Sequence, residues 1–205
     1  MDLTFNRGTI TVQGDVRIPN SIWDDRSKTF KAMALHYKDI IDYLNNSGID
    51  FTDNVLDLLP CPELQSKILL RDYQKQALDA WTLNDKRGVL VLPTGSGKTV
   101  IGIKAISLLN IPTIVIVPTL DLLDQWRTKL KEEFIIDVGT LGGGKHELKA
   151  LTVSTYDSAY IHAEKLGNKF SLIIFDEVHH LPAESFKQIA EMFASPFRMG
   201  LTAYL

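Results

Sequence analysis

A glycine-rich turn between an apolar strand and an apolar helix limits the folds open to this chain more than any other segment. The turn spans residues 92–99 and reads Leu-Pro-Thr-Gly-Ser-Gly-Lys-Thr. Its glycines let the backbone curl until amide hydrogens point inward, and the helix that follows adds its positive N-terminal end. Leu92 departs from the strict phosphate-loop pattern, which begins with glycine. The turn nevertheless predicts a nucleoside triphosphate site formed by Thr94, Gly95, Ser96, Gly97, Lys98 and Thr99.

Lys98 and Thr99 carry the chemistry expected of that turn. The Lys98 ammonium can reach the β- and γ-phosphates, and the Thr99 hydroxyl can ligate Mg²⁺. These two residues do not distinguish ATP from GTP, or a kinase from a motor protein.

Strands and helices alternate from about residue 63 onward. Short apolar runs of the kind buried in parallel sheets lie at residues 88–92, 113–117, 151–154, 171–175 and 199–202, and helices are predicted at 98–109 and 120–134. Repeated β-α-β order favours a doubly wound parallel sheet. We therefore expect an α/β fold for this part of the chain.

An acidic pair, Asp176 and Glu177, directly follows the apolar run at 171–175. The carboxyl ends of neighbouring parallel strands face one crevice, so Asp176 is expected beside the phosphate loop. Asp176 is then placed to hold Mg²⁺, and Glu177 to act as the general base that orients a water molecule. A nucleoside kinase would not need the second carboxylate, so the pair favours a motor. His179 and His180 follow, but no other ligands lie at metal-binding spacing.

The first 60 residues have a different pattern. Strands are predicted at 3–5, 9–13 and 16–18, with a turn at Gly14-Asp15. A long helix is predicted between Ser27, as its N-cap, and Gly48, because apolar residues recur there at three- and four-residue steps. Prolines flank Cys61 and interrupt the pattern. We expect a small α+β domain at 1–60 and a larger domain at 63–205.

Charge and composition exclude several classes of protein. The net charge is −3, with six Lys or Arg against nine Asp or Glu in residues 1–62, so no strongly basic footprint marks a nucleic-acid binder. No apolar run approaches the ~20 residues that span a bilayer. The N-terminus has no basic or apolar signal region. The single cysteine excludes an internal disulfide. We expect a cytoplasmic protein, prokaryotic or archaeal, without membrane contact.

Five motifs, in chain order, resemble those of superfamily 2 helicases. Residues 98–99 resemble motif I, and residues 176–179 resemble motif II. Residues 70–74 resemble the adenine-recognising Q-type motif, which implies that Gln74, helped by Arg71, reads the adenine edge. Residues 118–126 resemble motif Ia, and residues 201–203 resemble motif III. The resemblance implies a DNA-dependent ATPase that uses ATP and Mg²⁺.

Roles for further residues follow only from that resemblance. Motif Ia implies that Thr119 and Gln125 contact the DNA backbone. Residues 142–145, three glycines and Lys145, lie where superfamily 2 proteins carry further backbone contacts, and so do Thr155 and Tyr156. Motif III implies that Thr202, together with His179, couples hydrolysis to DNA binding.

The Leu-Pro-Thr-Gly loop, residues 176–183 and the Ile-Trp-Asp at 22–24 are most similar to the XPB family in its short archaeal form. That similarity implies a RecA-like fold for 63–205, a damage-recognition-like domain at 1–60, and DNA unwinding or translocation in nucleotide excision repair. The family continues into a second RecA-like lobe that supplies an arginine finger. This sequence ends at Tyr204-Leu205, which also departs from the family's Thr-Ala-Thr continuation. We therefore expect an N-terminal half that binds ATP weakly and by itself hydrolyses it negligibly.

The partners implied are DNA, the second lobe in cis, and a repair nuclease or a transcription–repair complex. Two other functions stay open. The motor subunit of a restriction enzyme shares the early motifs. A binding module would instead recognise distorted DNA through its N-terminal unit, although Phe5, Trp23 and Phe30 are expected in its core.

Overall fold

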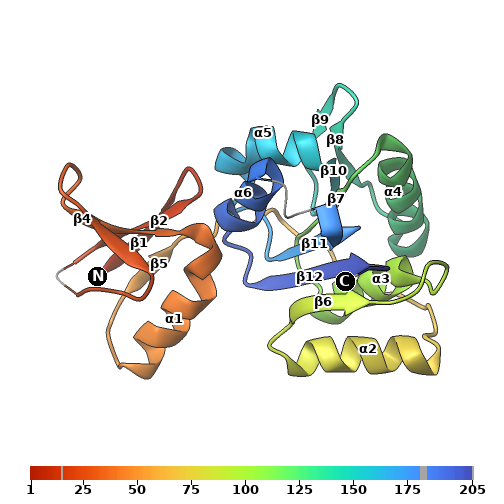
Figure 1. Ribbon diagram of the computed structural model, residues 1–205, viewed down its shortest axis with the longest axis horizontal. Coiled ribbons are helices and arrows are strands. Elements are labelled where there is room, and N and C mark those ends of the chain that lie inside the picture. The colour runs from red at the N-terminus through yellow and green to blue at the C-terminus, as the bar shows by residue number, and fades with distance from the viewer. Residues whose placement is uncertain (15, 181–183, 205) are drawn as a thin grey trace.

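The computed structural model describes residues 1–14, 16–180 and 184–204, which form two β-sheets with their helices (Figure 1). The N-terminal part contains β1 (Asp2–Asn6), β2 (Thr9–Gln13), β3 (Ser21–Asp24), β4 (Thr29–Met33), the 3-10 helix η1 (Ala34–His36), α1 (Tyr37–Asn46) and β5 (Thr52–Asn54). The C-terminal part contains α2 (Asp72–Leu83), β6 (Arg87–Val91), α3 (Lys98–Leu109), β7 (Thr113–Val117), α4 (Leu120–Phe134), β8 (Gly139–Gly142), β9 (Lys145–Glu147), β10 (Leu151–Thr155), α5 (Tyr156–Leu166), β11 (Leu172–Asp176), the 3-10 helix η2 (Val178–His180), α6 (Glu184–Met192) and β12 (Phe197–Thr202).

The larger sheet has seven strands in the order β6-β12-β11-β7-β10-β8-β9. Its strands pair in parallel except in the β8–β9 hairpin. One apolar core lies between the sheet and α2, α3 and α4, and a second lies on the α5 and α6 side. Helices therefore cover both faces, and the predicted doubly wound α/β fold is confirmed. The predicted ranges for α3, β7 and α4 match the structure residue for residue.

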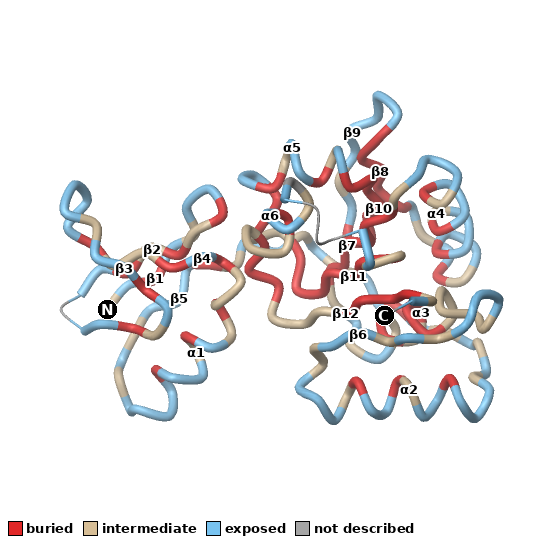
Figure 2. The backbone as a smooth tube through the Cα atoms, viewed as in Figure 1, coloured by how far each residue is buried: buried red, intermediate tan, exposed pale blue. Residues whose placement is uncertain are grey.

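The prediction that residues 88–92 form a buried strand is wrong about burial. β6 is the edge strand, and Val89 and Val91 remain 55% and 39% exposed. Figure 2 shows β6 largely exposed, whereas β7, β10 and β11 are buried. Leu90 of β6 and Leu92 just beyond it are the residues of this range that pack against the core beside α2, α3 and α4.

The smaller sheet has the order β3-β4-β2-β1-β5 and packs against α1 through Ile40 and Leu44. The long helix predicted from Ser27 is wrong in its first half. Ser27 instead lies in the β3–β4 turn, where its hydroxyl donates to the Asp24 carboxylate. Residues 29–33 form β4, because their apolar side chains also fit the alternation of a strand. The helix begins at Tyr37, and the predicted stop at Gly48 lies two residues beyond its end.

Two smaller predictions in this unit also differ from the structure. Residues 16–18 form no strand, although Ile18 is buried. Trp23 is 44% exposed rather than a core residue, and its ring stacks edge-on against Phe30. Asp15 lies outside the described residues.

The two sheet units touch through the β1–β2 turn. Gly8, with φ +85°, faces Met192 of α6 so closely that an added Cβ would lie 2.7 Å from that side chain. Arg7 forms an ion pair with Glu164 of α5, 2.6 Å away, and Arg87 of β6 forms one with Asp39 of α1, 3.1 Å away. Residues 55–71 form no helix or strand and run from the small unit across the larger one.

Candidate functional site

The phosphate loop joins the end of β6 to the start of α3. Gly95 and Gly97 have φ values of +77° and +79°, which favour glycine, and Gly97 is the N-cap of α3. An added Cβ at Gly95 would meet none of the described residues within 4 Å, so open space lies beside the Gly95 backbone. The Ser96 hydroxyl oxygen is buried and has no hydrogen-bond partner among the described residues. A curled backbone, a helix N-terminus and an orphaned hydroxyl fit a bound phosphate group.

Strand order brings the acidic pair to the same edge as the phosphate loop. β6 pairs in parallel with β12, and β12 pairs in parallel with β11, which ends at Asp176. The loop that follows β6 and the segment that follows β12 start side by side, because the Leu92 amide donates to the Thr202 carbonyl at 3.0 Å. The structure thus brings Lys98, Thr99 and the two carboxylates together at one edge. Lys98 itself turns back, and its ammonium donates to the Leu92 carbonyl at 3.2 Å.

Asp176 is 6% exposed, and each of its carboxylate oxygens accepts one hydrogen bond. The indole Nε1 of Trp126 donates to Oδ2 at 2.7 Å, and the Glu177 amide donates to Oδ1 at 3.1 Å. Burial raises the pKa of the Asp176 carboxyl, and the nearby Glu177 charge adds to that rise. The Trp126 hydrogen bond and the Lys98 charge oppose it. A cation at this carboxylate would favour its ionised form.

Glu177 has a left-handed backbone, with φ +51°. This conformation is uncommon for a residue other than glycine, and such strain concentrates at functional sites. His179 lies beyond it in η2, with Nδ1 3.4 Å from Glu177 Oε2 and 3.1 Å from the Thr202 hydroxyl. The predicted coupling residues His179 and Thr202 are therefore in contact. Within the stretch 176–183 that resembles the XPB family, residues 181–183 lie outside the described part of the chain.

A pocket of about 230 Å³ adjoins the phosphate loop. Its lining includes both residues predicted to read adenine, and it consists of Ile68, Leu69, Arg71, Gln74, Gly95, Ser96, Gly97 and Val100. The Gln74 amide is already engaged: its Oε1 accepts from the Arg71 amide at 2.9 Å and its Nε2 donates to the Ser96 carbonyl at 2.8 Å. Gln74 thus caps α2 and holds the phosphate loop at once.

Sequence reasoning missed three residues that contact the site. The Tyr73 hydroxyl donates to the Ser96 carbonyl at 2.8 Å, beside the Gln74 amide. The Tyr156 hydroxyl donates to the Asp176 carbonyl at 3.1 Å, and Trp126 holds the carboxylate. Tyr73 and Trp126 are each next in sequence to a predicted site residue. That proximity in the sequence was the one feature that could have pointed to them. The sequence predicts Tyr156 only as a DNA-backbone contact beside Thr155, and its bond to Asp176 was not expected.

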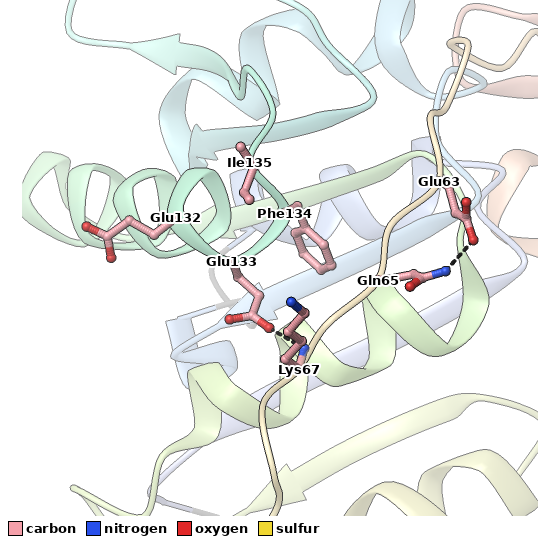
Figure 3. A pocket seen from close by; sticks show the side chains of 7 residues that line it. All are labelled: Glu63, Gln65, Lys67, Glu132, Glu133, Phe134 and Ile135. Carbon is pink, nitrogen blue, oxygen red and sulfur yellow. Dashed lines mark hydrogen bonds between the residues drawn. The ribbon is translucent and has the colours of Figure 1, made fainter.

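A second hollow, of about 420 Å³, lies away from this site (Figure 3). It forms where residues 63–67 cross the C-terminal end of α4, and none of the predicted site residues line it. The Glu133 carboxylate accepts hydrogen bonds from the amides of Lys67 and Ile68 at 2.7 and 3.3 Å. These contacts hold the irregular segment whose residues Ile68 and Leu69 line the pocket beside the phosphate loop.

The three predicted DNA-contacting residues lie on adjoining elements. Thr119 caps α4 and Thr155 caps α5, each accepting a backbone amide at 3.3 Å. β7 and β10 are paired in register, with Val117 opposite Thr155, so the two helices begin side by side. Gln125 is exposed on α4. The glycines at 142–144 lie beside them, since an added Cβ at Gly142 would lie 3.0 Å from Thr155 Cγ2.

Within the described residues, every helix is too short or too polar to cross a lipid bilayer. The same residues contain no group of three His, Cys, Asp or Glu side chains arranged for a metal ion.

Two family models match the chain. One, described as "Xeroderma pigmentosum group B helicase damage recognition domain", matches residues 3–55. The other, described as "Type III restriction enzyme, res subunit", matches residues 67–205.

Among curated proteins, the chain is 48% identical over 201 residues to "DNA 3'-5' translocase XPB2" of Sulfurisphaera tokodaii, covering 98% of this chain and 45% of that protein. It is 37% identical over 150 residues to "DNA 3'-5' helicase XPB" of Mycobacterium tuberculosis, covering 66% of this chain and 26% of that protein. The chain thus spans less than half the length of these relatives.

Among solved structures, the UvsW helicase from bacteriophage T4 aligns with a TM-score of 0.58 at 18% identity, covering 100% of this chain and 92% of that one. The Sulfolobus solfataricus SWI2/SNF2 ATPase core in complex with dsDNA aligns with a TM-score of 0.58 at 22% identity, covering 70% and 34%. At these identities the likeness shows a shared fold.

Proposed function

Because this chain belongs to the XPB family of superfamily 2 helicases, we propose that it forms the nucleotide-binding half of an ATP-driven motor that moves along duplex DNA. The relatives are named as DNA 3'-5' translocases and helicases, and the family uses ATP. One observation carries the proposal: the phosphate loop and the Asp176–Glu177 pair lie at the same edge of one parallel sheet.

The residues at this edge divide the work of hydrolysis. The amides of the phosphate loop and the Lys98 ammonium would hold the β- and γ-phosphates. The Thr99 hydroxyl and the Asp176 carboxylate would hold Mg²⁺, which when bound neutralises charge on the phosphate oxygens. Glu177, held beside them by its strained backbone, would take the proton of the attacking water.

Adenine would occupy the pocket lined by Arg71 and Gln74. Ile68 and Leu69 supply apolar surface there, and Leu69 is 92% exposed, as expected of a wall that packs against a ligand. Gln74 also donates a hydrogen bond to the Ser96 carbonyl. A base that hydrogen-bonds to Gln74 would therefore alter the contact that fixes the phosphate loop. The choice of ATP over GTP rests on the family resemblance of residues 70–74, not on these hydrogen bonds.

DNA would lie across the starts of α4 and α5. Helix N-termini bind phosphate groups through free amides, without reading sequence. The N-termini of α4 and α5, capped by Thr119 and Thr155, lie side by side. Such a pair can bind two phosphate groups of one DNA strand. His179 and Thr202 would then couple this surface to the nucleotide through their contact. We further propose that residues 1–60 form a separate unit that engages distorted DNA, as the name of its matching family model suggests.

The partners of the whole protein follow the same reasoning. The relatives include subunits named "General transcription and DNA repair factor IIH helicase/translocase subunit XPB", which suggests a repair role and a multiprotein partner. A second RecA-like lobe would supply the arginine finger. Hydrolysis by the chain alone should therefore be roughly three to five orders of magnitude slower than with that lobe. The motor subunit of a restriction enzyme remains the second candidate, because the model that matches residues 67–205 bears that description.

Calorimetric titration of the chain with Mg·ADP tests the nucleotide site. Lys98→Ala should weaken binding by about tenfold or more, because a charge-assisted contact to phosphate is lost. Lys129→Ala, an exposed lysine on α4, is the matched control and should bind normally. Equal affinity of the Lys98→Ala and native chains would overturn the proposal.

A further inference from the structure

A buried hydrogen bond joins α4 to the end of β11. The indole Nε1 of Trp126 lies 2.7 Å from Asp176 Oδ2, and the two residues are 1% and 6% exposed. A buried hydrogen bond to a carboxylate is stronger than one between neutral groups, and water cannot replace it.

Three donors together restrict the Asp176 carboxylate. Trp126 binds Oδ2, the Glu177 amide binds Oδ1, and the Tyr156 hydroxyl binds the Asp176 carbonyl. The first two oppose rotation of the carboxylate, and the third holds its backbone. Among the described residues, Oδ1 accepts only the neighbouring amide, and it keeps lone pairs for another ligand.

Trp126 is itself held against the helix that follows the phosphate loop. An added Cβ at Gly102 would lie 2.7 Å from Trp126 Cη2, so the ring packs directly on the backbone of α3. Gly102 is four residues after Lys98 and therefore lies on the same face of α3, one turn further along. One rigid ring thus connects α3, α4 and the end of β11.

The chemistry of the donor suits this place. An indole N–H is a single neutral donor, so it orients the carboxylate without neutralising its charge. A lysine or arginine here would form an ion pair and compete with a cation. Gln125, next in the sequence, is exposed, so the same turn of α4 presents one side chain to solvent and one to Asp176.

We propose that Trp126 is a positioning residue that holds the Asp176 carboxylate in the orientation that receives a divalent cation at the phosphate loop. The inference rests on the proposed nucleotide site and adds a residue to it. Through Trp126, α4 and its residues Thr119 and Gln125 are also connected to the carboxylate that would hold the cation.

The test compares two tryptophans in the same chain. Trp126→Phe keeps most of the ring and removes the donor to Asp176. Trp81→Phe is the matched control, because Trp81 is also buried, at 2% exposure, and its Nε1 donates to the Arg198 carbonyl at 2.9 Å. Binding of ADP is measured by calorimetry with Mg²⁺ and with EDTA.

Trp126→Phe should weaken Mg·ADP binding by about tenfold and leave metal-free ADP binding unchanged, since the loss acts through Asp176. Trp81→Phe should leave both affinities unchanged, although it removes a comparable buried hydrogen bond. Equal weakening with and without Mg²⁺, or no weakening, would overturn the positioning role. If the native chain itself fails to bind Mg·ADP, the proposed function fails first, and the two failures are thereby distinguished.

A second measurement uses only the native chain. In the native chain, the indole N–H resonance of Trp126 should shift when Mg·ADP is added and shift far less with ADP in EDTA. The Trp81 resonance should stay in place in both titrations. A Trp126 resonance that does not respond to Mg·ADP, in a chain that binds it, would also overturn the inference.

Discussion

Nδ1 of His179 lies 3.1 Å from the Thr202 hydroxyl, which joins the segment after the acidic pair to the end of β12. The same hydroxyl accepts the Tyr204 amide at 3.1 Å, and the same imidazole nitrogen lies 3.4 Å from Glu177 Oε2. Thr202 is 2% exposed, so this contact is shielded from water on one side. Movement of the Glu177 side chain would therefore act on the residues that follow β12 through only two intervening residues, His179 and Thr202.

That contact should appear as a coupling energy. His179→Ala, Thr202→Val and the double variant form a cycle measured by denaturant unfolding. We expect a coupling of about 0.5–1.5 kcal/mol, the usual net contribution of one hydrogen bond. His179→Ala combined with Thr82→Val is the control and should be additive, because the Thr82 hydroxyl bonds within α2. An additive His179–Thr202 cycle would show that the contact contributes nothing to stability.

Gly97→Ala should disrupt the phosphate loop from two sides. Its φ of +79° disfavours any Cβ, and that Cβ would lie 2.6 Å from Gln74 Nε2. We expect Mg·ADP affinity to fall by about tenfold or more, measured by calorimetry, as the loop and the Gln74 amide separate. Gly144→Ala is the control, since Gly144 has φ +80° and nothing within 4 Å of an added Cβ. It should lose stability from backbone strain and keep normal nucleotide affinity.

Gly102→Ala should destabilise the chain although alanine is the better helix former. Propensity alone favours alanine by about 1 kcal/mol, but overpacking a core costs about 1–3 kcal/mol. The added methyl would meet Trp126 Cη2 at 2.7 Å and Ile174 Cδ1 at 3.6 Å. Denaturant unfolding followed by tryptophan fluorescence measures the loss. Leu108→Ala, at an exposed position of the same helix, should change stability by less than about 0.5 kcal/mol.

His162 should make the fold sensitive to mild acid. Burial lowers the pKa of His162, and the neighbouring His146 and Lys165 charges lower it further. A base with a lowered pKa binds fewer protons in the fold than in the unfolded chain. The contribution of neutral His162 to the free energy of unfolding is therefore complete above the unfolded-state pKa of about 6.5. It is lost as the pH falls below that value.

Thermal unfolding between pH 7.5 and 5.5 measures this effect. His162→Gln should flatten the fall in Tm across that interval, and Tyr160→Phe on the same helix should keep the native slope. The His146 and His162 rings lie 4.5 Å apart and edge-on, so His146→Gln should flatten the slope in part. An unchanged slope in His162→Gln would assign the acid sensitivity to other groups.

Local pattern determined most of the larger sheet. Apolar runs of strand length, a helix bounded by Gly97 and Asn110, and a turn with two left-handed glycines are all properties of neighbouring residues. That is why α3, β7 and α4 were predicted to the residue. The chemistry of Lys98, Asp176 and Glu177 was equally readable, since each lies directly after a predicted strand or turn. The β3–β4 hairpin was missed, because its apolar spacing between Phe30 and Tyr37 fits a helix face as well as a strand.

Only the tertiary structure decided which of these pieces touch. Strand order placed β12 between the phosphate-loop strand and the acidic strand, and it left β6 at the exposed edge. The bond from Trp126 to Asp176 joins residues 50 positions apart, and the Gln74 bond to the Ser96 carbonyl joins residues 22 apart. Periodicity records which face of an element is apolar, but it holds no information about which distant element covers that face. The positions of Lys98, Asp176 and Glu177 relative to one another therefore come from packing, and the residue types from the sequence.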